Sequence, residues 1–102
     1  MSLEILENDN VYHVNGTLTS KNIHILNKYI SKVINTSKCV ILNLEGVIQF
    51  DSKAAYILLK IFIDAVHNNT KFSVIGKRNK KLIQVLQETE TMHIWSQSRI
   101  LR

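Results

Sequence analysis

Asp51 and Ser52 are the side chains with the clearest chemical potential, and they stand side by side near the middle of the chain. A long apolar helical segment begins directly after them, and the first turn of a helix needs side chains that satisfy its unpaired N–H groups. A hydroxyl at such a helix start is also a suitable phosphoacceptor. Ser52 is therefore interpreted either as a helix cap or as a site of phosphorylation.

Residues typical of enzymes and metal sites are scattered along the rest of the chain. The four histidines stand singly and have no cysteine or histidine at the spacing of metal ligands. Ser52 lacks a Gly-x-Ser-x-Gly elbow, and no glycine-rich phosphate loop is present. We therefore expect no enzyme activity, no metal site and no cofactor.

Composition places the chain among small globular proteins. Its 102 residues, 45% of them hydrophobic, suffice for one domain with a single core. No apolar run reaches the roughly 18 residues that span a bilayer, and the acidic N-terminus lacks the basic start of a secretory signal. We predict a cytoplasmic protein without membrane insertion, in which the lone cysteine, Cys39, is a small core residue.

The net charge of +5 has its main local source in the basic run from Lys77 to Lys81. Four cations at a helix start are unfavourable for the helix dipole, so the run either contacts an anion or forms a solvated turn. We favour the solvated turn. No aromatic residue interleaves with these cations, and nucleic-acid binding is therefore not expected.

Hydrophobic patterns predict the elements that position Asp51 and Ser52. Alternating and apolar runs indicate strands, and apolar residues at helical spacing indicate helices. Gly46 is expected to end the central strand, so that a loop leads from it to Asp51, and Gly16 is expected to open a second loop before the first helix. The expected strands are 3–6, 11–16, 39–44 and 71–76, and the expected helices are 23 to about 34, 52 to about 67, and 79–88.

This β-β-α-β-α-β-α order predicts an α/β fold: an N-terminal hairpin, then right-handed crossovers that build a mixed sheet of four or five strands with mostly parallel inner strands. Residues 92–95 offer a possible last strand or a core-closing turn. The helix that follows Ser52 also carries Tyr56, Ile57 and Ile63 away from its apolar face. These three residues form either a partner surface or a contact with an adjoining loop.

Four segments together resemble the signature segments of STAS domains, in order and in spacing. Individually they are weak motifs, but their joint spacing extends over about 80 residues. The part most typical of the family is the strand, loop, Asp-Ser and helix combination around Asp51. The segments are Gly16-Thr17-Leu18-Thr19, Val40-Ile41-Leu42-Asn43-Leu44-Glu45-Gly46-Val47, Phe50-Asp51-Ser52 and Phe72-Ser73-Val74-Ile75-Gly76.

The resemblance implies a STAS-like fold with its helices mainly on one face of the sheet. It also implies one STAS domain over residues 1–102, with its core at about 3–95. The tail, 96–102, is polar apart from Ile100 and Leu101 and is therefore expected to fray. In family members that are anti-sigma factor antagonists, a kinase phosphorylates the serine at this helix start. This kinase is the anti-sigma factor itself, and it is bound by the unphosphorylated antagonist.

By position, Ser52 is then the phosphoacceptor candidate and the partner would be an anti-sigma factor with serine kinase activity. The partner-binding surface carried over from the family comprises Thr17, Thr19, Ser20, Gln49, Asp51, Lys53, Tyr56 and Ile57. The family usually continues Ser/Thr-Gly-Leu-Gly after its Asp-Ser pair, whereas this chain has Lys53-Ala54-Ala55-Tyr56. Two alternatives thus stay open: a STAS subunit that docks on an ABC-type ATPase or membrane transporter, and a STAS scaffold without phosphoacceptor function.

Overall fold

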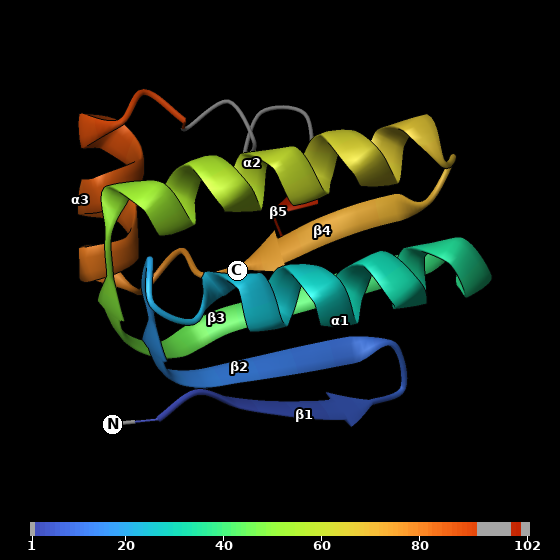
Figure 1. Cartoon of the computed structure of the whole chain (residues 1–102), viewed down its shortest axis with the longest axis horizontal. Coiled ribbons are helices and arrows are strands. Elements are labelled where there is room, and N and C mark those ends of the chain that lie inside the picture. Colours follow the sequence, from blue (N-terminus) through green and yellow to red (C-terminus); the bar gives the residue numbers. More distant parts are fainter. Residues whose placement is uncertain (1, 92–98, 101–102) are drawn as a thin grey trace.

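The structure is a computed structural model that describes residues 2–91 and 99–100. Its elements follow the predicted order and add a final strand (Figure 1). They are β1 (Glu4–Asn8), β2 (Val11–Leu18), α1 (Ile23–Thr36), β3 (Cys39–Phe50), α2 (Ser52–His67), β4 (Lys71–Ile75), α3 (Lys80–Glu88) and β5 (Arg99–Ile100). Residues 92–95, where a last strand or turn was expected, lie outside the described residues. The final strand instead lies within the tail that was expected to fray.

The strands form one mixed sheet in the order β1-β2-β3-β4-β5. The first two strands pair antiparallel, and every other neighbouring pair is parallel. Asp9 and Asn10 make the hairpin turn with φ values of 51° and 70°, which polar Asp and Asn side chains tolerate better than most. The predicted hairpin and the parallel inner strands are both confirmed.

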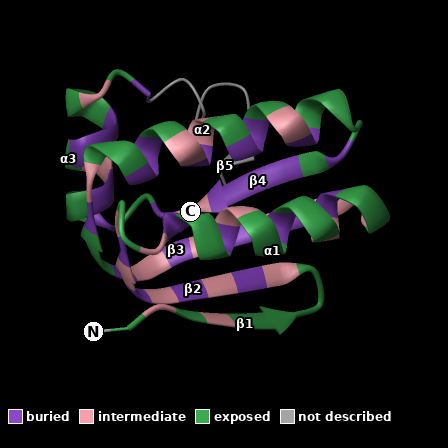
Figure 2. Ribbon diagram, in the orientation of Figure 1, coloured by how far each residue is buried: buried purple, intermediate pink, exposed green. Residues whose placement is uncertain are grey.

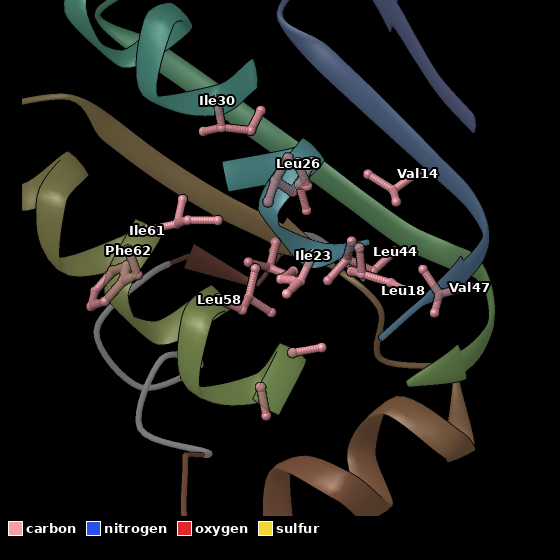
Figure 3. Close-up of a cluster of buried hydrophobic side chains, with 14 of the residues drawn as sticks. Val14, Leu18, Ile23, Leu26, Ile30, Leu44, Val47, Leu58, Ile61 and Phe62 are labelled. Carbon is pink, nitrogen blue, oxygen red and sulfur yellow. The ribbon is translucent and has the colours of Figure 1, made fainter. Parts of the chain in front are cut away.

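Helices α1 and α2 lie side by side on the same face of the sheet, while α3 packs at one end against β3 and α2 (Figure 1). The sheet turns alternate side chains toward these helices, as Tyr12 and Val14 of β2 show. Figure 2 shows the resulting buried layer between sheet and helices, with exposed residues on the outer sides of α1 and α2. Leu26, Leu44 and Leu58 come from different elements and meet in this core (Figure 3).

The central strand is longer than predicted. Gly46 lies inside β3 rather than at its end, and β2 likewise continues through Gly16 to Leu18. Two shifts of register, between His13 and Asn15 and between Gly16 and Thr17, allow the pairing of β2 with β3 to continue. The predicted loops were therefore wrong, because bulges let a strand pass through glycine and polar residues that resemble a loop.

Asn79 fixes this irregular part of β3 from outside the sheet. It caps α3, where its Oδ1 accepts a hydrogen bond of 3.1 Å from the N–H of Leu82. Its Nδ2 donates to the carbonyl oxygens of Leu44 and Val47, both at 2.8 Å. The side chain is 8% exposed. One buried amide thus satisfies three backbone groups that would otherwise be costly to bury.

Candidate functional site

The Asp51 carboxylate joins two segments that are far apart in the sequence. Its Oδ1 accepts a hydrogen bond of 2.9 Å from the N–H of Ala54, which makes Asp51 the N-cap of α2. Its Oδ2 accepts another of 2.9 Å from the N–H of Ser20, in the turn between β2 and α1. The start of α2 and the β2–α1 turn are therefore held together by one side chain.

Ser52 is the first residue of α2, and its side chain is exposed. Because Asp51 caps the helix, the interpretation of Ser52 as the cap was wrong. The Ser52 hydroxyl makes no hydrogen bond within the described part of the chain. It stands at the positive end of the helix dipole beside the exposed Lys53, so its oxygen is accessible to reagents and partners.

Two opposing effects act on the pKa of the Asp51 carboxyl. Partial burial is the largest single effect and raises the pKa, because it disfavours the charged form. The backbone N–H groups of Ser20 and Ala54, together with the Ser20 hydroxyl, favour the charged form and jointly outweigh burial. The pKa is thus held below its ordinary value of 3.8, and Asp51 is a carboxylate at neutral pH.

The lowered pKa of Asp51 makes the stability of the fold depend on pH. Because the folded-state pKa lies below the unfolded value, the charged carboxylate stabilises the fold above the unfolded pKa, and this contribution is lost as pH falls through the folded-state pKa. Asp51→Asn retains a side-chain oxygen that can cap α2. This oxygen is uncharged, however, and it replaces only one of the two acceptor oxygens of the carboxylate. We expect this variant to have a lower free energy of unfolding than the wild type at pH 7. The difference between the two proteins should narrow toward about pH 3.

Urea unfolding of both proteins across this pH range measures this difference. Asp64→Asn serves as a matched control, because it makes the same change near the other end of α2. The difference in free energy of unfolding between this control and the wild type should change less with pH. A difference for Asp51→Asn that stays constant from neutral to acid pH would contradict the prediction.

The turn beside Asp51 forms a shallow polar hollow. It gathers five of the eight residues predicted to bind a partner and adds Lys21 and Asn22. The lining residues are Thr17, Thr19, Ser20, Lys21, Asn22, Gln49 and Asp51. Residues from two separate parts of the sequence, 17–22 and 49–51, thus come together at one end of the molecule, next to the exposed hydroxyl of Ser52.

The other three predicted partner residues follow along α2. Lys53 and Tyr56 are exposed, and the Tyr56 side chain retains 54% of its accessible surface. Ile57 is half-buried and packs partly against the core. Ile63 is exposed as well. Tyr56 and Ile63 are therefore not covered by a loop among the described residues, whereas Ile57 is partly enclosed.

Asn22 is a residue of this site that sequence reasoning missed. Its Nδ2 donates to the carbonyl oxygen of Thr17 at 2.9 Å, and its Oδ1 accepts from the N–H of Thr19 at 2.9 Å. This side chain shapes the turn that presents Ser20 to Asp51. Asn22 occupies the N-cap position of α1, but its side chain makes no capping hydrogen bond to the helix. An asparagine directly before an apolar helical stripe is nevertheless a signal that was available in the sequence.

The basic run lies at the start of α3, and its four cationic side chains are exposed. The N–H of Arg78 donates to Oε2 of Glu45 at 3.1 Å, which ties the turn to β3. Among the described residues, no three His, Cys, Asp or Glu side chains are grouped closely enough to hold a metal ion. No helix in the described ranges has the length and apolar character that crossing a membrane requires.

Cys39 is half-buried rather than fully enclosed in the core. It lies at the first position of β3, and the next residue, Val40, is the one that points into the core. The prediction of a core cysteine was therefore only partly right, because strand alternation turns Cys39 away from the helices.

Comparison with known proteins places this geometry in a family. The STAS domain model matches residues 1–97. A proposed anti-sigma factor antagonist from Thermotoga maritima is 21% identical over 96% of this chain and 84% of its own, with a TM-score of 0.68. An anti-sigma factor antagonist from Mycobacterium paratuberculosis is 18% identical over 97% and 83%, with a TM-score of 0.67.

The unphosphorylated anti-sigma factor antagonist SpoIIAA has a similar fold, with 14% identity over 84% of this chain and 82% of its own and a TM-score of 0.64. No curated protein matches the sequence significantly. At these identities the solved structures support the fold alone, whereas the family model covers nearly the whole sequence. The chain belongs to the STAS domain family.

Proposed function

We propose that this protein is a non-catalytic regulator that binds a protein partner through the surface around Ser52. This Ser52 surface comprises Thr17, Thr19, Ser20, Gln49, Asp51, Ser52, Lys53, Tyr56 and Ile57. The observation that carries the proposal is the exposed Ser52 hydroxyl beside a turn that Asp51 locks in place. A surface that is held rigid before binding loses less conformational entropy when a partner docks.

Phosphorylation of Ser52 would change the charge of this surface sharply. A phosphoryl group adds about 1.5 to 2 negative charges at neutral pH. The helix dipole and Lys53 favour that charge, while the adjacent Asp51 carboxylate opposes it. A partner that packs closely on Ser52 in its hydroxyl form would be repelled or sterically displaced by the phosphorylated form.

The partner that this chemistry fits best is an anti-sigma factor that is also a serine kinase. Such a partner must approach the hydroxyl closely enough to transfer phosphate, and it must release the product. The three solved structures described above are of anti-sigma factor antagonists or a proposed one, and they share this fold. Binding by the unphosphorylated form and release after phosphorylation then constitute the switch.

Intact mass measurement tests the proposal after incubation with ATP and an anti-sigma factor kinase from the same organism. We expect the wild type to gain one phosphoryl group and Ser52→Ala to gain none. Ser31→Ala is the matched control, because Ser31 is also exposed and lies on a helix, and it should be modified like the wild type. Failure of the wild type to gain phosphate, while a known antagonist is modified in parallel, would contradict the proposed switch.

A further inference from the structure

Helix α1 presents an apolar stripe to solvent on the side nearest β1. Ile25 retains 49% of its accessible surface and Tyr29 retains 39%, and Val33 is half-buried one turn further on. The three residues are spaced four apart, so they lie in a row along one face of the helix. The Tyr29 ring also packs edge-on against Tyr12, with 6.0 Å between ring centroids, which fixes the stripe in position.

Two adjoining hollows make this stripe part of a groove. One lies between the start of α1 and the N-terminal segment, where Leu3 and Ile5 face Ile25. The other extends along α1, and Ile25 lines both. We define the α1–β1 groove by Leu3, Ile5, Ile25, Tyr29 and Val33. From Ile25 to Val33 the groove is about 12 Å long, which matches roughly two turns of a bound helix.

The rim of the α1–β1 groove is cationic. Lys28 and Lys32 supply its positive charge on α1, and His24 lines the same edge. Residues 10–44 contain four lysines and no aspartate or glutamate, so the charged side chains of α1 and its flanking segments are lysines alone. Glu7 of β1 is an exposed acid near Tyr12, at the end of the strand away from Leu3. An apolar groove with a basic rim is complementary to an acidic amphipathic helix.

Other occupants fit the groove less well. A second copy of the chain would bring two positively charged proteins together, because each carries a net charge of +5. A lipid bilayer is best bound by a helix whose apolar face is free to insert, whereas the main apolar face of α1 is buried against the sheet. A concave apolar site instead accepts a protruding helix from a protein partner.

We propose that the α1–β1 groove docks an acidic amphipathic helix of a partner protein. Apolar side chains of that helix fill the space between Ile25, Tyr29 and Ile5, and its carboxylates pair with Lys28 and Lys32. The groove uses none of the residues of the Ser52 surface. The two surfaces adjoin at the start of α1, where Asn22 lines both the hollow beside Asp51 and the first hollow of the groove. The α1–β1 groove is thus a second contact surface next to the Ser52 surface.

The test uses a fluorescently labelled peptide of about 16 residues, designed as an amphipathic helix with leucines at three- and four-residue intervals and flanking glutamates. We expect the full-length protein to bind it, with amide NMR shifts confined to α1 and β1 and with affinity that falls as salt increases. A peptide of the same composition with scrambled leucines, and a lysine-for-glutamate version, should bind at least about tenfold more weakly.

Substitutions in the groove, and matched substitutions on α2 and α3, show where the peptide binds. Lys28→Glu combined with Lys32→Glu should lower the affinity for the peptide about tenfold, because it removes the charge pairing with the glutamates. Ile25→Ala should lower the affinity about fivefold, because it removes apolar contact. Lys60→Glu combined with Lys81→Glu makes the same charge change on α2 and α3, and it should bind like the wild type. Circular dichroism verifies that all variants are folded.

The following three outcomes would each contradict the proposal. Shifts centred on α3 or on Ser52, or equal loss of affinity in both double variants, would mean that the peptide binds basic surface nonspecifically. Binding to vesicles of phosphatidylserine and phosphatidylcholine that is tighter than peptide binding, and that is lost in Lys28→Glu/Lys32→Glu, would assign the surface to membranes. Dimers that dissociate in Ile25→Ala would assign it to a second copy of the chain.

Discussion

Replacement of Asn79 by alanine is expected to lower the free energy of unfolding by about 3 kcal/mol. The variant loses the cap on Leu82 and also leaves the carbonyl oxygens of Leu44 and Val47 without their donor in a buried setting. Small domains have only about 5–15 kcal/mol of total stability, so the loss is large but leaves the protein folded. Urea unfolding measures it directly, with a fall in Tm of about 15 °C as a second readout.

Two further variants separate the roles of this side chain. Asn79→Ser keeps a cap acceptor but lacks an amide that reaches both carbonyls, so we expect it to recover only about 1 kcal/mol. Asn35→Ala removes an exposed asparagine with one long hydrogen bond to Asn68 and should change stability by less than about 0.5 kcal/mol. Full recovery in Asn79→Ser would show that the cap alone matters.

Gly16→Ala is expected to destabilise the protein by about 2–3 kcal/mol. Gly16 has φ of +93° inside β2, a conformation that residues with a Cβ rarely adopt. A Cβ at this position would also overlap the carbonyl oxygen of Ser2. The register shift between β2 and β3 occurs directly after Gly16, so strain here would also disturb the strand that leads to Ser20.

Gly46→Ala is the matched control on the neighbouring strand. A Cβ there would meet the side-chain oxygen of Asn15, which can rotate away, and Gly46 does not have a positive φ. We expect a cost of no more than about 1 kcal/mol. Equal losses in both variants would show that the backbone conformation of Gly16 is not the decisive factor. The kinase assay on Gly16→Ala then reports whether the distortion reaches the Ser52 surface.

Much of the fold could be predicted because its signals are local. The helix from Ser52 to His67 has the predicted bounds, since an aspartate cap, an apolar stripe and a terminal asparagine all lie within a few residues of its ends. The hairpin at Asp9 and Asn10 is equally local. Alternation of strand and helix then leaves few topologies for the sheet.

The errors concern interactions between distant residues. β3 continues through Gly46 because β2 supplies pairing partners at shifted register and Asn79, 33 residues later, satisfies irregular carbonyls. The hydrogen bond that Asp51 accepts from Ser20 likewise could not be predicted from a local sequence pattern, since the two residues are 31 positions apart. The sequence therefore indicated that Asp51 and Ser52 belong to the site. Only the fold shows that Asp51 caps α2 and that Ser52 is left exposed.

The bond between Ser20 and Asp51 also means that the Ser52 surface exists only in the completed fold. It needs β2, the first turn of α1, the whole of β3 and the start of α2 to be in place at once. A nascent or partly unfolded chain cannot present both halves, so a partner that contacts both selects mature molecules. By mass action such a partner would also protect the chain from unfolding, by about 2.7 kcal/mol at a hundredfold excess over Kd.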